Sequence, residues 1–67
     1  MLLVEKYEKG SLYLSLHKGH QVFIVSLYAE NNFAEIPEWD RSIEVLRREF
    51  VKVEDAKAYF ETVKNIL

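Results

Sequence analysis

The sequence predicts a small α+β domain in which an antiparallel sheet of three or four strands is covered on one face by a C-terminal helix. Three observations predict this fold. The first half of the chain contains apolar and alternating runs, separated by two glycine-containing turns. From residue 53 onward, apolar side chains recur at spacings of three and four. The 67 residues contain no repeat or linker, so we expect one domain over residues 1–67 with the order ββββα.

Two strands are expected over residues 2–8 and 11–17, joined by the charged turn Glu8-Lys9-Gly10. In the second strand, leucines at positions 12, 14 and 16 alternate with Tyr13, Ser15 and His17. Because successive side chains of a strand point to opposite faces, this strand has one leucine face.

A third strand is expected over residues 21–29, after the turn Lys18-Gly19, where glycine tolerates a positive φ. The run Val22–Val25 is apolar on both faces. Such a run is typical of a central strand, or of a strand whose second side is buried by a subunit contact.

Residues 42–50 fit two interpretations. Ile43 and Val45 suit a strand, whereas positions 43, 46, 47 and 50 also lie at helical spacing. We prefer a strand, because β-branched residues cluster here and a fourth strand would cover the edge of a three-stranded meander. On a strand, Arg47 and Glu49 would share a face with Arg41 and Ile43, which indicates a charged sheet edge more than a phosphate-binding track.

The C-terminal helix is the clearest element. It begins near Val53, with Glu54 and Asp55 in the first turn and Lys64 near the end, as the helix dipole favours. A helix of about 15 residues is about 22 Å long, and a seven-residue strand is about 23 Å long. The helix can therefore lie along one face of the sheet and cover its leucines.

Composition and charge exclude several classes of protein. The chain has no cysteine, so neither a disulfide framework nor a thiolate metal site is possible. The apolar run Leu2–Val4 is too short for a signal peptide or a membrane span, and we expect a cytoplasmic protein with no membrane contact. The net charge of −2 argues mildly against nonspecific nucleic-acid binding.

The sequence contains no motif for catalysis, metal binding or cofactor binding. His17 and His20 bracket one turn, but a zinc site needs three or four ligands and carboxylates would complete it only by chance of folding. No serine lies in a glycine-bounded elbow, and the two glycines stand alone in their turns. We therefore expect no enzyme activity, no metal and no cofactor.

The candidate partner-binding segment is residues 33–40, where apolar side chains spaced three apart alternate with acids. The candidate partner-binding residues are Phe33, Glu35, Ile36, Glu38, Trp39 and Asp40. Aromatic anchors fill pockets on a partner, and acids steer a segment towards a basic surface. In the other interpretation, Phe33 and Trp39 fold back over the end of the core; for Trp39 we favour this lid, because tryptophan is a large share of the available apolar area.

A second surface is suggested by Tyr7, Tyr13 and Tyr28, which we expect to share the sheet face away from the helix. We interpret it as a partly buried face or a dimer contact, since lysines are too few for a base-stacking platform. In element order alone, ββββα is similar to whirly-type single-stranded nucleic-acid binders. That resemblance implies nucleic-acid binding by a dimer as the alternative function.

We therefore expect a non-enzymatic protein-binding module, an inhibitor or adaptor, that recognises a larger protein partner through the acidic aromatic segment and the exposed sheet face. Small cysteine-free domains with an acidic patch are common among phage and mobile-element proteins that block host machinery, including anti-CRISPR proteins. The two-sided third strand and the apolar end at Ile66-Leu67 also predict a homodimer.

Overall fold

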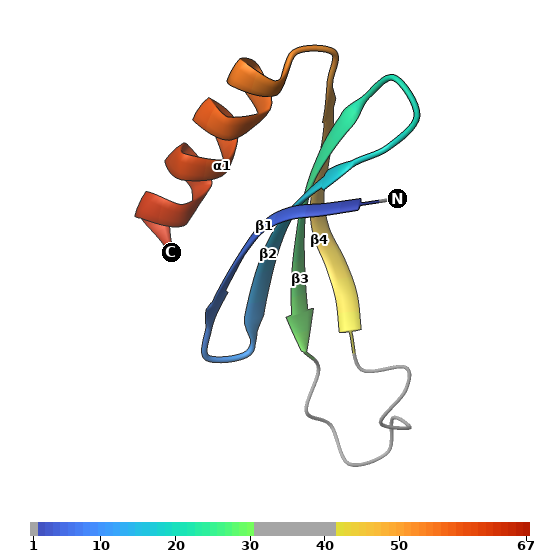
Figure 1. Cartoon of the computed structure of the whole chain (residues 1–67). Helices are drawn as coiled ribbons and strands as arrows, with labels where there is room; N and C mark the ends of the chain where they lie inside the picture. Colours follow the sequence, from blue (N-terminus) through green and yellow to red (C-terminus); the bar gives the residue numbers. More distant parts are fainter. Residues whose placement is uncertain (1, 31–41) are drawn as a thin grey trace.

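A computed structural model describes residues 2–30 and 42–67, and it contains four antiparallel strands followed by one helix (Figure 1). The elements are β1 (Leu2–Lys9), β2 (Leu12–Lys18), β3 (Phe23–Glu30), β4 (Ser42–Phe50) and α1 (Val53–Ile66). The strands lie in the sheet in the order of the chain, as a meander. The predicted ββββα fold is confirmed, and so is the preference for a strand over residues 42–50.

The predicted leucine face of β2 packs against the helix. Strand pairing places Leu14 opposite Leu27 and Leu16 opposite Val25, so that all four side chains lie on one face. Helix α1 buries Ala56, Phe60 and Val63 against them. Among the described residues, Phe60 is the largest fully buried side chain, with 1% of its surface exposed. Because one helix covers one face, the hydrophobic core is a single layer between α1 and the sheet.

Two cation–π contacts join the helix to the two edge strands. The guanidinium carbon of Arg48 in β4 lies 5.2 Å from the ring centroid of Tyr59 in α1. On the other edge, the Lys64 ammonium lies 5.3 Å from the ring centroid of Tyr7 in β1. Both distances are within the range in which a ring attracts a cation. The helix is thus attached at both of its sides.

The prediction that Tyr7 shares a face with the other two strand tyrosines is wrong. A two-residue turn at Gly10-Ser11 joins β1 to β2 and pairs Lys9 with Leu12. This register places Tyr7 opposite Leu14, and directly opposed residues lie on the same face of a sheet. Tyr7 therefore packs against the core, on the helix side.

The turn between β2 and β3 also differs from the expectation. The positive φ belongs to Gln21, at 65°, and not to Gly19. The Gly19 amide donates a hydrogen bond to the Val22 carbonyl oxygen over 2.8 Å. A Cβ on Gly19 would lie 3.6 Å from Cδ1 of Ile24, so the turn backbone closes over this side chain.

Each edge strand contains one residue that is skipped in the pairing register. Val4 interrupts β1 and Val45 interrupts β4, as expected of β-bulges. The bulge at Val45 reverses the alternation, so that Ile43 lies opposite Ala29 and on the other face from Arg47. The expectation that Ile43 and Arg47 share a face is therefore wrong. Arg47 and Glu49 do share a face, as expected. Arg41 lies outside the described residues.

Replacing Phe60 by alanine tests the single core. Such truncations cost about 3 to 5 kcal/mol, whereas a domain of this length has a total stability of about 3 to 10 kcal/mol. We expect Phe60→Ala to be largely unfolded or close to it in urea titrations followed by circular dichroism. Lys57→Ala, on the exposed side of the helix, is the control and should unfold at the wild-type urea concentration.

The two glycines give a matched test of backbone conformation. Gly10 has φ 59°, where a side chain costs about 1 to 2 kcal/mol, so Gly10→Ala should lower the unfolding free energy by that amount. Gly19→Ala places a methyl group at ordinary contact distances and should be neutral, or stabilising by up to about 1 kcal/mol. Equal losses in the two variants, measured by urea denaturation, would contradict this assignment.

Candidate binding face

The six residues predicted to bind a partner lie outside the described part of the chain. They are Phe33, Glu35, Ile36, Glu38, Trp39 and Asp40. The structure does place the two residues that flank their segment, because Glu30 and Ser42 are paired at the adjoining ends of β3 and β4. The Glu30 amide also donates a hydrogen bond to the Ser11 carbonyl oxygen over 2.9 Å. The segment is thus joined to the sheet beside the β1–β2 turn.

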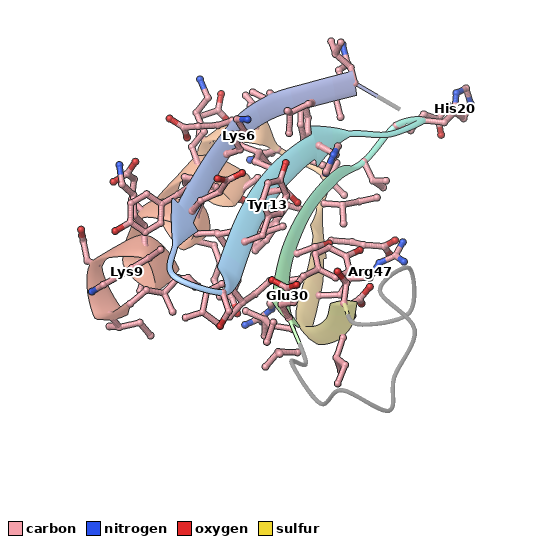
Figure 2. The ribbon with its side chains drawn as sticks, turned by 90° about the horizontal axis from the view of Figure 1, so that it is seen from below. Lys6, Lys9, Tyr13, His20, Glu30 and Arg47 are labelled. Atoms are coloured by element: carbon pink, nitrogen blue, oxygen red, sulfur yellow. The ribbon has the colours of Figure 1, made fainter. Side chains whose placement is uncertain are left out.

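The face of the sheet opposite α1, which we call the open face, is the candidate site within the described residues. All four strands contribute to it, as the labelled side chains of Lys6, Tyr13, Glu30 and Arg47 show in Figure 2. By strand pairing, it comprises Leu3, Lys6 and Glu8 of β1, Tyr13, Ser15 and His17 of β2, Ile24, Ser26, Tyr28 and Glu30 of β3, and Ser42, Glu44, Arg47 and Glu49 of β4.

A row of small hydroxyl side chains crosses the centre of this face. Ser15 lies opposite Ser26, and the row ends in Lys6 on β1 and Arg47 on β4. Both serines are buried although no helix covers them: Ser15 is 0% exposed and Ser26 is 4% exposed. Larger side chains in the rows on either side therefore stand above them. The face is low along its centre and high on both sides.

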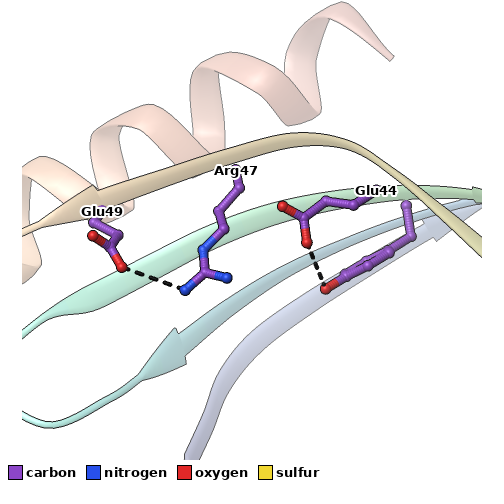
Figure 3. A network of polar contacts seen from close by, with 4 residues as sticks. Glu44, Arg47 and Glu49 are labelled. Carbon is purple, nitrogen blue, oxygen red and sulfur yellow. Dashed lines mark hydrogen bonds and ion pairs between the residues drawn. The ribbon is translucent and has the colours of Figure 1, made fainter.

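The next row pairs two tyrosines between two glutamates. Tyr13 lies opposite Tyr28, with Glu8 beyond Tyr13 and Glu44 beyond Tyr28. Both tyrosines are half-buried. The Tyr28 hydroxyl donates a hydrogen bond to Oε2 of Glu44 over 3.2 Å (Figure 3). The prediction that Tyr13 and Tyr28 share the face away from the helix is confirmed.

The open face is net negative. Arg47 forms an ion pair with Glu49, with Nη2 and Oε1 3.3 Å apart (Figure 3). Both side chains are more than half exposed, at 51% and 57%, so the pair contributes little to stability. The face carries two basic residues, Lys6 and Arg47, and four glutamates. Its net charge is therefore 2 − 4 = −2, with His17 counted as neutral.

Two hollows lie on the open face. One, of about 270 Å³, is lined by His17, Ile24, Ser26, Tyr28 and Arg47. The other, of about 240 Å³, is at the end that carries the β1–β2 turn, and is lined by Glu8, Gly10, Ser11, Leu12, Tyr13, Tyr28, Glu30 and Ser42. We call the second one the acidic hollow. Tyr28 lines both hollows.

The two histidines that bracket the β2–β3 turn differ in burial. His17 is half-buried on the open face, and His20 is exposed at the tip of the β2–β3 hairpin (Figure 2). Within residues 2–30 and 42–67, no three histidine or acidic side chains are placed to hold a metal ion. The described part of the chain also contains no helix of the length and apolar character needed to cross a membrane.

Comparison with known proteins gives no assignment, since no family model, curated protein or solved structure matches this chain. The candidate site therefore depends on geometry alone.

Sequence reasoning found the tyrosine pair but missed the acidic hollow. Glu8 and Glu30 are 22 positions apart in sequence, and they line one hollow because β1 and β3 both flank β2. No local pattern indicates such a pair. The alternation of β2 was the one signal that could have pointed to it, because it places Tyr13 between the neighbouring strands.

Ser15 provides a test of the geometry of the open face. Its Oγ is buried and has no hydrogen-bond partner among the described residues. An unsatisfied buried hydroxyl costs about 1 to 3 kcal/mol, so Ser15→Ala should raise the unfolding free energy, by about 1 kcal/mol. Ser26→Ala is the control: Ser26 is also nearly fully buried, but its hydroxyl is not left buried without a partner, so its loss should not raise the unfolding free energy. A loss of stability in Ser15→Ala would show that its hydroxyl is satisfied.

Proposed function

We propose that this protein is a non-catalytic protein-binding module, an inhibitor or adaptor, whose open face docks on a larger protein partner. The observation that supports the proposal is the pair Tyr13 and Tyr28, held half-buried beside a low central row and surrounded by charged side chains. Binding surfaces commonly combine aromatic anchors at the centre with a polar rim. On the other face, the centre of the described sheet is covered by α1.

The sheet edges are less suited to binding than the open face. An exposed edge strand binds a partner by adding a strand, which needs a regular ladder of free backbone groups. Here β1 is interrupted at Val4 and β4 at Val45. Bulges of this kind are a means by which proteins prevent edge-to-edge pairing. Docking through side chains of the open face avoids this obstacle.

The charge of the open face favours a basic partner surface. Its net charge of −2 has the same sign as that of the predicted docking segment, which carries Glu35, Glu38 and Asp40. Electrostatic complementarity raises association rates and excludes wrong partners. We therefore propose that the partner presents lysine or arginine side chains to the open face.

The alternative function, binding of single-stranded nucleic acid, has one observation in its favour. Tyr13 and Tyr28 lie next to a row that ends in Lys6 and Arg47, and aromatic rings with basic neighbours bind unpaired bases. However, Arg47 is already paired with Glu49, and the four glutamates of the face would repel phosphates. A protein partner is the better fit.

The predicted homodimer stays a prediction, and one of its reasons is weaker than expected. Ile24, on the second apolar side of β3, is only 5% exposed within a single chain. Its burial does not require a subunit contact. A second copy could still cover the exposed apolar side chains of the described residues, which include Ile66, the other reason for the prediction. They are Leu2, Leu3, Val4, Ile43, Val45, Val51 and Ile66.

Quantitative capture from nuclease-treated lysate of the natural host tests the proposed function. We expect a protein retained by wild type to be lost about tenfold or more with Tyr13→Ala, because truncation of an interface anchor typically costs about 2 kcal/mol or more. The control is Lys57→Ala, on the exposed side of α1. Circular dichroism of both variants would show that the fold is kept.

Two outcomes would contradict the proposal. Equal retention by wild type and Tyr13→Ala would show that the open face is not the docking surface. Loss of all retained material upon nuclease treatment, together with tight and salt-sensitive binding of fluorescent oligonucleotides, would establish the nucleic-acid alternative instead.

A further inference from the structure

We infer that the acidic hollow receives the guanidinium group of an arginine side chain from the protein partner. This inference rests on the proposed function and names the chemistry of the contact. Four observations support it: the charge of the hollow, the state of its tyrosines, its size, and the kinds of group that line it.

The carboxylates of the hollow have no described counter-ion. Glu8 and Glu30 line it, and none of the lysines and arginines in residues 2–30 and 42–67 is among its lining residues. The nearest lysine in sequence, Lys9, is directed elsewhere: its Nζ donates a hydrogen bond to the Leu67 carbonyl oxygen beside the end of α1 (Figure 2). Glu44 adds a third carboxylate beside Tyr28. This end of the open face therefore attracts a cation.

The tyrosines of the chain divide into two pairs. Tyr7 and Tyr59, on the helix side, each have a basic side chain over the ring, at 5.3 and 5.2 Å from the centroid. Tyr13 and Tyr28, on the open face, have no such partner within residues 2–30 and 42–67. Both tyrosines line the acidic hollow, together with Glu8 and Glu30. The hollow thus offers the aromatic surface that a cation occupies on the helix side.

The size of the hollow suits one side chain. Its volume of about 240 Å³ is below the range of about 300 to 1,000 Å³ that is usual for pockets that bind whole small molecules. A side chain delivered by a docked protein needs only this much space. The hollow also lies at the end of the face, where a partner that covers the Tyr13–Tyr28 pair would reach it.

The lining groups favour arginine over lysine. A guanidinium is planar, stacks on aromatic rings, and donates hydrogen bonds in several directions within its plane. The acidic hollow is lined by two tyrosines and by residues that carry acceptors, namely two glutamates and the serines Ser11 and Ser42. An ammonium is a compact and strongly hydrated charge that makes less use of the rings.

The test is an NMR titration of the intact protein with N-acetyl-arginine amide. The neutral control ligand is N-acetyl-citrulline amide, which has nearly the same shape. We expect saturable shifts of the amides of Gly10, Ser11, Tyr13 and Tyr28 with the arginine ligand, and a Kd of about 1 to 10 mM, since a single side chain provides little binding energy. N-acetyl-lysine amide should bind more weakly, and citrulline should give no saturable shift.

Charge-neutral variants locate the contact. Glu8→Gln combined with Glu30→Gln should weaken arginine binding about fivefold or more, as expected when charge-assisted hydrogen bonds are lost. Glu61→Gln, on the exposed side of α1, is the matched control and should leave the Kd unchanged. Equal binding of citrulline, or an unchanged Kd in the double variant, would overturn the inference.

The two proposals fail in different ways. A flat arginine titration, combined with partner capture that depends on Tyr13, overturns the arginine site and leaves the docking face in place. A saturating titration that requires Glu8 and Glu30, combined with capture that ignores Tyr13, supports the arginine site and overturns the docking face.

Discussion

The packing of Phe60 against the leucine face of the sheet is the contact on which the rest of the structure depends. A chain of 67 residues hides only about 60% of its unfolded surface, so one helix and one sheet face must provide most of the hydrophobic stabilisation. The cation–π contacts of Arg48 and Lys64 hold the helix over both edges of the sheet. Within residues 2–30 and 42–67, α1 is the only helix, so no described element covers the other face of the sheet.

The open face shows how such a surface is built without a covering layer. Ser15 and Ser26 are buried beneath larger neighbours, and the Ser15 hydroxyl has no partner among the described residues. An apolar residue at this position would be better for stability alone. Small side chains occupy the centre of the face between its tyrosine and histidine rows, and one of them, Ser26, lines the hollow of about 270 Å³. Surfaces that serve binding commonly keep features that stability would not select.

The four tyrosines serve two purposes, one in the fold and one in the proposed function. Tyr7 and Tyr59 hold the helix by pairing with basic side chains of the same chain. Tyr13 and Tyr28 present similar rings on the opposite face, with glutamates beside them. The same interaction that attaches the helix is thereby available to a partner. The end of the face that carries the acidic hollow is also where residues 31–41, with their predicted docking acids, join the sheet at Glu30 and Ser42.

The sequence by itself determined the periodic features: the leucine face of β2, the apolar face of α1, the meander order, the strand over residues 42–50, and the shared face of Tyr13 and Tyr28. Each follows from side-chain alternation or helical spacing within one element, which is a local property. Only the tertiary structure decided the face of Tyr7, the reversal at Val45 and the meeting of Glu8 with Glu30. These depend on the length of a turn and on the register between strands, and a shift of one residue moves every side chain of a strand to the other face.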